Sequence, residues 1–163
     1  MFTVHPIALG NQCSEVSLFV TEDGYGSTVL DVQNVSGFSR RAVAMHRLDK
    51  YVADRGLPLP DLIKMDVQGG ELQILSAAQE CLRHASALLL ETWLYRSYGQ
   101  QTPLQAEIIA YVSDFAFDLA EIGDRYYNET HQLVSVDALF LKQDELAERK
   151  GTLPPGDWVE EST

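Results

Sequence analysis

The chain has 163 residues, 45% of them hydrophobic and 22% charged, which is the composition of one globular domain rather than of a disordered protein. Its formal net charge of −12 leaves no basic face for a nucleic-acid partner, and we interpret the acidity as a solubility feature. The two cysteines show no zinc or disulfide spacing, so we expect no metal partner. No apolar run reaches the roughly 20 residues of a membrane span, and the N-terminus lacks signal-peptide features. We therefore expect a cytoplasmic protein without a membrane partner.

Short strands separated by turns are predicted for the first third of the chain. Four segments have the length and composition of strands, namely residues 3–9, 15–20, 27–32 and 40–48. Polar stretches that contain glycine separate them, which is typical of turns. A short helix is predicted over residues 48–56, because glycine at its end stops helices.

The middle of the chain has the pattern of a βαβ unit. Residues 61–67, "DLIKMDV", form a continuous apolar run, which is typical of a parallel strand buried on both faces. Apolar residues then recur at helical spacing from Leu72 to Leu82, which predicts one helix of about four turns. Residues 85–93, "ASALLLETW", form a second buried strand, so the helix is predicted to cross over between parallel strands.

A further helix and a final hairpin are predicted after this unit. The helix is expected to begin with Thr102 as its cap and Pro103 in its first position, with Glu107 in its first turns. Residues 117–123 and 132–142 are predicted as two strands, joined by the polar loop between them.

The order of these elements predicts an α/β class with a mostly parallel sheet and a late antiparallel addition. We expect one α/β domain over residues 1–142. Residues 143–163 are polar and acidic without periodicity, so we expect them to form a loose tail.

Two carboxylates stand at the ends of the two predicted parallel strands. Asp66 comes at the carboxyl end of residues 61–67, and Glu91 comes at the corresponding end of residues 85–93. Ligands bind beyond these strand ends in open α/β sheets. If the strands are neighbours, both acids face one crevice, where a carboxylate accepts a hydroxyl proton, binds a hydroxyl group or holds a cation. Glycines at 69 and 70 let the following loop turn sharply or approach a ligand.

Structural roles remain open for the same residues. Asp66 also suits a helix cap, Glu71 suits a first helical turn because the helix dipole favours an acid there, and Glu91 also suits a surface position. Lys64 is expected to neutralise one of these carboxylates, since a buried lysine is rarely left unpaired.

Aromatic and histidine residues give weaker signals. Trp93 is a candidate for a pocket wall or for the core, and Tyr126 and Tyr127 suit either a pocket or an exposed hairpin end. The four histidines lie far apart without ligand spacing, so we expect structural or exposed roles for them.

Four segments together resemble the C-terminal portion of the FkbM-type methyltransferases: "LDKYVADRG", "DLIKMDVQGGELQIL", "ALLLETW" and "VDALFLK". The family pattern has a lysine two residues before an aspartate, then an acidic or amide residue, a glycine and a glutamate. The matching positions here are Lys64, Asp66, Gln68, Gly69 and Glu71. The resemblance extends from about Val4 to Lys142, with a mild departure at Gly70, where the family often has alanine or a larger residue.

The resemblance implies a Rossmann-like fold and S-adenosylmethionine as cofactor. It implies O-methylation of a hydroxyl on a small molecule or sugar, with Asp66 or Glu91 orienting or deprotonating that hydroxyl. It also implies that Ala8 and Leu9 flank the adenine and that Asp66 contributes to cofactor binding.

The main departure from the family is at the front of the chain. Family members have a first strand with a D-x-G-x-x-x-G loop and a second strand ending in an acid, whereas "MFTVHPIALG" resembles their third strand. We therefore expect a partial sheet without the first two strands. The exposed edge of this partial sheet would then be covered by the front strands or by another chain through self-association. In the third alternative, the sequence is a truncated reading of a longer gene that encodes the two strands.

Two hypotheses follow from this departure. The first is an S-adenosylmethionine-dependent O-methyltransferase, and the second is a non-catalytic methyltransferase-like remnant or interaction module. A hydrolase and a nucleotide triphosphatase are disfavoured, because neither G-x-S-x-G nor G-x-x-x-x-G-K-[ST] occurs.

Overall fold

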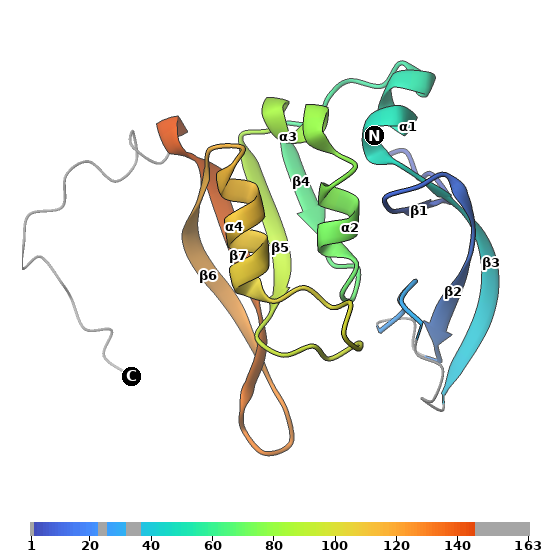
Figure 1. The fold of residues 1–163 in the computed structure, drawn as a ribbon, viewed down its shortest axis with the longest axis vertical. Helices are drawn as coiled ribbons and strands as arrows, with labels where there is room; N and C mark the ends of the chain where they lie inside the picture. The colour runs from blue at the N-terminus through green and yellow to red at the C-terminus, as the bar shows by residue number, and fades with distance from the viewer. Residues whose placement is uncertain (1, 23–25, 32–36, 146–163) are drawn as a thin grey trace, which may run out of the picture.

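A computed structural model describes residues 2–22, 26–31 and 37–145, and Figure 1 shows their arrangement. Most of the predicted tail therefore lies outside the described residues. Helices and strands follow one another along the chain as β1 (Ala8–Leu9), β2 (Ser14–Thr21), β3 (Phe38–His46), α1 (Leu48–Arg55), β4 (Leu62–Met65), α2 (Glu71–Leu75), α3 (Gln79–His84), β5 (Ala87–Trp93), α4 (Gln105–Ser113), β6 (Phe117–Tyr127) and β7 (Leu133–Lys142).

The strands form two mixed sheets, ordered β1-β3-β2 and β4-β5-β7-β6. The α/β class is confirmed, and β4 pairs with β5 in parallel as predicted. The predicted C-terminal antiparallel hairpin is confirmed as the pair β6–β7. The sheets are mixed rather than mostly parallel, because β2 runs antiparallel to β3 and β7 runs antiparallel to β5. In Figure 1 the two sheets lie side by side, with β1 and β2 on the side of β4.

The front strands differ from the prediction in length. β1 has only two paired residues, opposite Met45 and His46, because Pro6 has no amide hydrogen to continue the ladder and Phe2 is fully exposed. In the predicted strand 27–32, the described residues make one bridge, in which Thr28 exchanges backbone hydrogen bonds with Phe19.

The predicted crossover helix is two short helices, α2 and α3. The Ser76 hydroxyl donates to the carbonyl of Gln73 at 2.7 Å, which competes with the regular helix ladder. The chain restarts at α3 because Asp49, from α1, accepts hydrogen bonds from the backbone amides of Glu80 and Cys81 at 2.9 and 3.0 Å. A carboxylate from elsewhere in the chain thus caps α3, and no local sequence pattern shows it.

Helix α4 begins later than predicted. Its cap is Leu104, whose amide donates to the Glu107 carboxylate at 2.7 Å, so Glu107 acts as expected. Thr102 is not the cap, because its hydroxyl accepts instead a hydrogen bond from the backbone amide of Tyr98 at 3.0 Å.

The predicted polar loop at residues 124–131 is also partly wrong, since strand β6 continues to Tyr127.

The main core lies between the sheet β4-β5-β7-β6 and the helices α2, α3 and α4. Figure 1 views the molecule from the side on which these helices cover the sheet. Its largest fully buried side chains include Phe117, Phe140, Leu75, Leu82, Leu88 and Leu90. Each such side chain contributes about 1.5–3 kcal/mol by leaving water. This packing fixes the carboxyl ends of β4 and β5 at one edge of the sheet.

Strand β4 is buried on one face only, contrary to the prediction. Ile63 and Met65 point into the core, whereas Leu62 is 56% exposed and the Lys64 side chain is 58% exposed. The prediction failed because no described helix covers the second face of β4.

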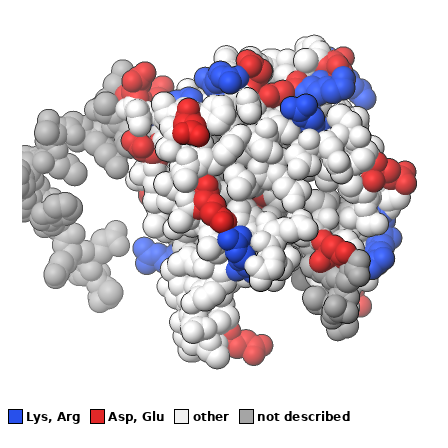
Figure 2. Space-filling model, in the orientation of Figure 1, with Lys and Arg blue, Asp and Glu red and all other residues white. Residues whose placement is uncertain are grey.

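Acidic and basic side chains are interspersed over the face seen in Figure 2. Among the helices of the described residues, none has the length and apolar character needed to cross a membrane.

Candidate active site

The two predicted site carboxylates, Asp66 and Glu91, meet at one end of the parallel pair β4–β5. The register places Met65 opposite Leu90, so the residues that follow these two in the chain are Asp66 and Glu91. The side-chain amide nitrogen of Gln68 donates to Asp66 Oδ1 at 2.7 Å and to Glu91 Oε2 at 2.9 Å. One amide group therefore joins both carboxylates, but they do not face one crevice as predicted, because Asp66 and Glu91 line different cavities.

The loop of residues 66–70 is held in an uncommon backbone conformation. Gln68 has a backbone φ of 55° and Gly69 a φ of 96°. Residues other than glycine rarely adopt positive φ values of this kind. The Thr28 hydroxyl donates to the carbonyl of Gln68 at 2.9 Å. This contact ties the loop to the front part of the chain and holds the backbone of Gln68 in place.

Glu71 holds the same loop from inside. Its Oε1 accepts hydrogen bonds from the backbone amides of Val67 at 3.4 Å and Gly69 at 3.2 Å, and its side chain is fully buried. Burial raises the pKa of the Glu71 carboxyl above its ordinary value. The structure thus adds a loop-clamping role to the helix-dipole role that the sequence suggested.

Glu91 has the electrostatic surroundings of a proton acceptor. It is 8% exposed, and Ser135 donates to its Oε1 at 2.9 Å. Burial raises the pKa of Glu91 to about 7, and the nearby carboxylates of Asp66, Glu71 and Asp137 act in the same direction. The Ser135 hydrogen bond opposes this rise without cancelling it. A carboxyl group with this pKa exchanges protons near neutral pH.

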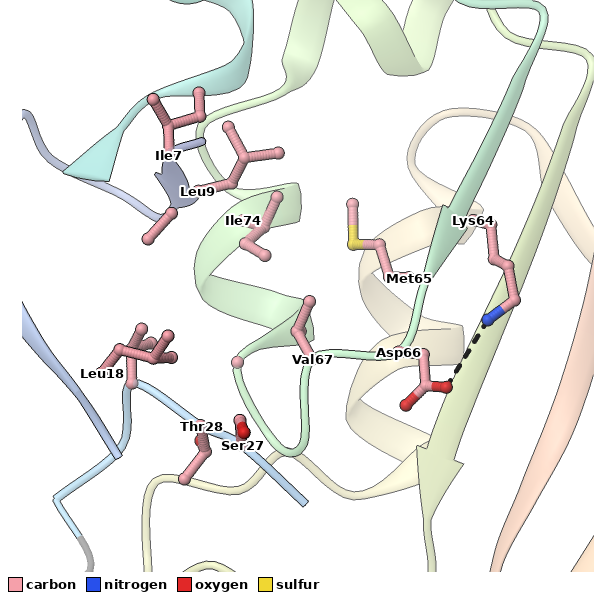
Figure 3. A pocket seen from close by; sticks show the side chains of 13 residues that line it. Ile7, Leu9, Leu18, Ser27, Thr28, Lys64, Met65, Asp66, Val67 and Ile74 are labelled. Atoms are coloured by element: carbon pink, nitrogen blue, oxygen red, sulfur yellow. Dashed lines mark ion pairs between the residues drawn. The ribbon is translucent and has the colours of Figure 1, made fainter. Parts of the chain in front are cut away.

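Lys64 pairs with Asp66, with 3.6 Å between Nζ and Oδ2, and Figure 3 marks this contact. The predicted neutralisation is confirmed, but the pair is exposed rather than buried. Its contribution to stability is therefore about 0–1 kcal/mol. The pair partly offsets the negative charge at the Asp66 end of the site.

A cavity of about 280 Å³ lies between the front sheet and the edge of β4. Its lining includes Ala8, Leu9 and Asp66, the three residues that the resemblance assigned to the cofactor. Figure 3 shows Ile7 and Leu9 on the same side of the cavity as Ile74, with Asp66 on the other. The walls are mainly apolar, and one end carries a carboxylate.

A second cavity of about 520 Å³ lies on the Glu91 side. Its lining includes Glu91, Ser135, Trp93, Tyr98, Tyr126 and Tyr127. Trp93 and the two tyrosines of β6 are therefore pocket residues, one of the alternatives that the sequence left open. The Tyr98 hydroxyl donates to the side-chain oxygen of Gln68, so the Gln68 amide contacts one lining residue of the first cavity and two of the second.

Sequence reasoning missed three residues of this site. Gln68 was noted only as a motif position, and its amide in a loop between two acids was the available signal. Ser135 reaches Glu91 because β7 pairs with β5, a partner choice that the sequence did not show. Tyr98 lies in an irregular segment without a pattern.

In the described part of the chain, no three His, Cys, Asp or Glu side chains gather as a metal site.

Comparison with known families gives one match. The family model described as "Methyltransferase FkbM domain" matches residues 2–119, which include both acids, the Gln68 loop and the residues of the first cavity named above. The comparisons with curated proteins and with solved structures found no match.

Proposed function

The chain belongs to the FkbM methyltransferase domain family, and from this premise we propose that it transfers a methyl group from S-adenosylmethionine to a hydroxyl of a small molecule or glycan. The observation that carries the proposal is the contact of Gln68 with Asp66 and Glu91. These two acids line different cavities, so the amide stands where a cofactor and an acceptor would come together.

The first cavity suits S-adenosylmethionine in chemical character. Leu9, Met65 and Ile74 offer apolar walls for an adenine ring, and Asp66 offers an acceptor for a ribose hydroxyl or a partner for a positive charge. Its volume of about 280 Å³ is close to the lower end of ligand-sized cavities. We assign Ala8, Leu9 and Asp66 to cofactor binding on this basis.

The cofactor, when bound, supplies a methyl group that is already activated by its positive sulfur. The chain's own residues then have to align the acceptor and take its proton. Glu91 is the proton acceptor, because its carboxylate is available near neutral pH and its two oxygens are oriented by Ser135 and Gln68. Asp66 orients the reacting groups from the cofactor side.

Calorimetry with S-adenosylmethionine tests the proposal. The purified chain should bind it at micromolar concentrations, and Leu9→Trp should weaken binding at least about tenfold by filling the cavity, a loss of about 1.4 kcal/mol. Leu59→Trp is the matched control, because Leu59 is outside the lining and partly exposed.

The competing hypothesis, stated above from the sequence, is a non-catalytic remnant or interaction module. A chain that is folded by circular dichroism and gives no binding heat would overturn the enzyme proposal and support the remnant. Binding that Leu9→Trp and Leu59→Trp leave equally strong would overturn the assignment of the first cavity.

A further inference from the structure

We propose that the second cavity, which we name the aromatic cavity and define by Glu91, Trp93, Tyr98, Tyr126 and Tyr127, takes an oxygen-bearing ring compound without an anionic group. This inference rests on the proposed function in one respect, that the aromatic cavity holds the methyl acceptor. It adds a chemical class: acceptors that carry a carboxylate or a phosphate are rejected.

The walls of the aromatic cavity are suited to a ring. Trp93 and Tyr98 meet edge to face, with 5.3 Å between ring centroids and 84° between ring planes, so their relative orientation is fixed by contact. Tyr126 and Tyr127 come from the exposed end of β6 and complete the lining. The volume of about 520 Å³ lies within the range of small-molecule sites. Aromatic faces bind the apolar faces of ring compounds and leave hydroxyl groups at the ring edge free for other contacts.

The indole N–H of Trp93 indicates an oxygen on the ligand. Trp93 is 6% exposed, and its Nε1 is buried without a hydrogen-bond partner among the described residues. A buried donor of this kind is unfavourable and uncommon in folded proteins. Trp93 lines the aromatic cavity, although its Nε1 has almost no exposed surface there. We therefore expect a compound with an ether, carbonyl or hydroxyl oxygen to bind with a shift of the indole that brings the N–H to this acceptor.

The charges around the aromatic cavity disfavour an anion. Glu91 is its only lining residue with a formal charge, and no lysine or arginine is among the residues described as lining it. Asp137 lies opposite Glu91 in the β5–β7 pairing, and Asp66 adds a further carboxylate through Gln68. Lys64 acts on Asp66 and Asp137, so it offsets only part of this charge.

The raised pKa values of two lining tyrosines agree with surroundings in which carboxylates outweigh the positive charge of Lys64. The pKa of Tyr98 is raised, first by burial and then by Glu91, Glu71 and Asp66. The pKa of Tyr126 is raised mainly by Asp137. A carboxylate or phosphate on the ligand would meet like charges at short range, which selects against it.

Fluorescence of Trp93 provides a direct binding readout. The chain has two tryptophans, so Trp158→Phe leaves Trp93 as the only reporter. The probes are two matched pairs: methyl glucoside with methyl glucuronoside, whose carboxylate is free, and 4-hydroxycyclohexanecarboxamide with 4-hydroxycyclohexanecarboxylate. We expect a neutral member to change Trp93 emission at millimolar concentration and to bind about tenfold or more tightly than its anionic partner.

Two variants connect the selectivity to its cause. Glu91→Gln should narrow the difference between neutral and anionic probes, whereas Glu121→Gln, on β6 and outside the lining, should keep it. Trp93→Phe keeps an aromatic wall and removes the N–H, so calorimetry should show weaker binding of the neutral probes.

Equal or tighter binding of the anionic probes, or no response of Trp93 to either neutral probe, would overturn the inference. The failures are distinguishable from those of the proposed function, because the probes are measured without cofactor. A chain that binds S-adenosylmethionine but prefers the anionic probes refutes only this inference. A chain with the expected selectivity and no cofactor binding refutes only the proposed function.

Discussion

The Gly69→Ala substitution tests how tightly the 66–70 loop is packed into the site. Gly69 has φ of 96°, and a methyl group there would lie 2.9 Å from Leu30 Cδ1 and 3.2 Å from Thr102 Oγ1. Both neighbours are buried, so neither can move away freely. The substitution therefore adds backbone strain of about 1–3 kcal/mol and overpacking of about 1–3 kcal/mol.

Gly99→Ala separates these two costs. Gly99 has the same φ of 96°, and no described atom lies within 4 Å of the methyl group that alanine would add. It should carry the backbone strain alone, so Gly69→Ala should be about 1–3 kcal/mol less stable than Gly99→Ala. For a chain of this size, that difference corresponds to a melting temperature lower by roughly 2–12 °C.

Urea unfolding followed by circular dichroism, with calorimetric melting as a second measure, gives the required comparison. Equal free energies of unfolding for the two variants would refute the tight packing of the loop against Leu30 and Thr102. Equal m-values are needed for the comparison, since a change in m reports a different unfolded or native state.

Other parts of the molecule give three further predictions. Phe140→Ala should lower the free energy of unfolding by about 3–5 kcal/mol, whereas Phe2→Ala, at a fully exposed position, should change it by less than about 0.5 kcal/mol in the same urea assay. Burial raises the pKa of Glu91 from its ordinary 4.5 to about 7, so the folded chain retains a proton that the unfolded chain releases, and the contribution of Glu91 to stability should fall as pH rises through this window. Urea unfolding across this pH range should show a weaker decline for Glu91→Gln, and an unchanged profile would contradict the raised pKa. Asp49→Ala should cost about 1 kcal/mol by uncapping α3, whereas Asp54→Ala should cost less because its pair with Lys50 is exposed; equal losses would argue against the cap.

The meeting of Asp66 and Glu91 was predictable because it depends on a short-range pattern. Two buried strands separated by a helical crossover are expected to pair in parallel, and the acid of each then falls at the same sheet edge. The family resemblance was likewise carried by motif spacing, and the match over residues 2–119 confirms it.

The features that the sequence did not show depend on contacts between distant segments. Asp49 interrupts the predicted long helix by capping α3, although Leu75, Ala78 and Leu82 keep helical spacing across the break. Lys64 is exposed because no described helix covers its face of β4. The apolar run of residues 62–65 predicts a strand, but it does not show whether a helix packs on each face of that strand.

Some predictions from the sequence stay predictions. The absence of the first two family strands, self-association through the free edge of β4, and the division of the chain at residue 142 concern features that the described residues do not test. β4 has one described strand partner, β5, so its other edge is where self-association would be sought.

The central claim is that a cofactor site and a proton acceptor share the junction at Gln68. Carbon-13 NMR titration of the Glu91 carboxyl, assigned by its loss in Glu91→Gln, tests this most directly. The account predicts a pKa of about 7 for Glu91 in the free chain and a lower pKa with S-adenosylmethionine, whose positive sulfur stabilises the nearby carboxylate. S-adenosylhomocysteine, whose sulfur carries no charge, should have a smaller effect. A Glu91 that titrates near 4.5 and does not respond to S-adenosylmethionine would contradict it.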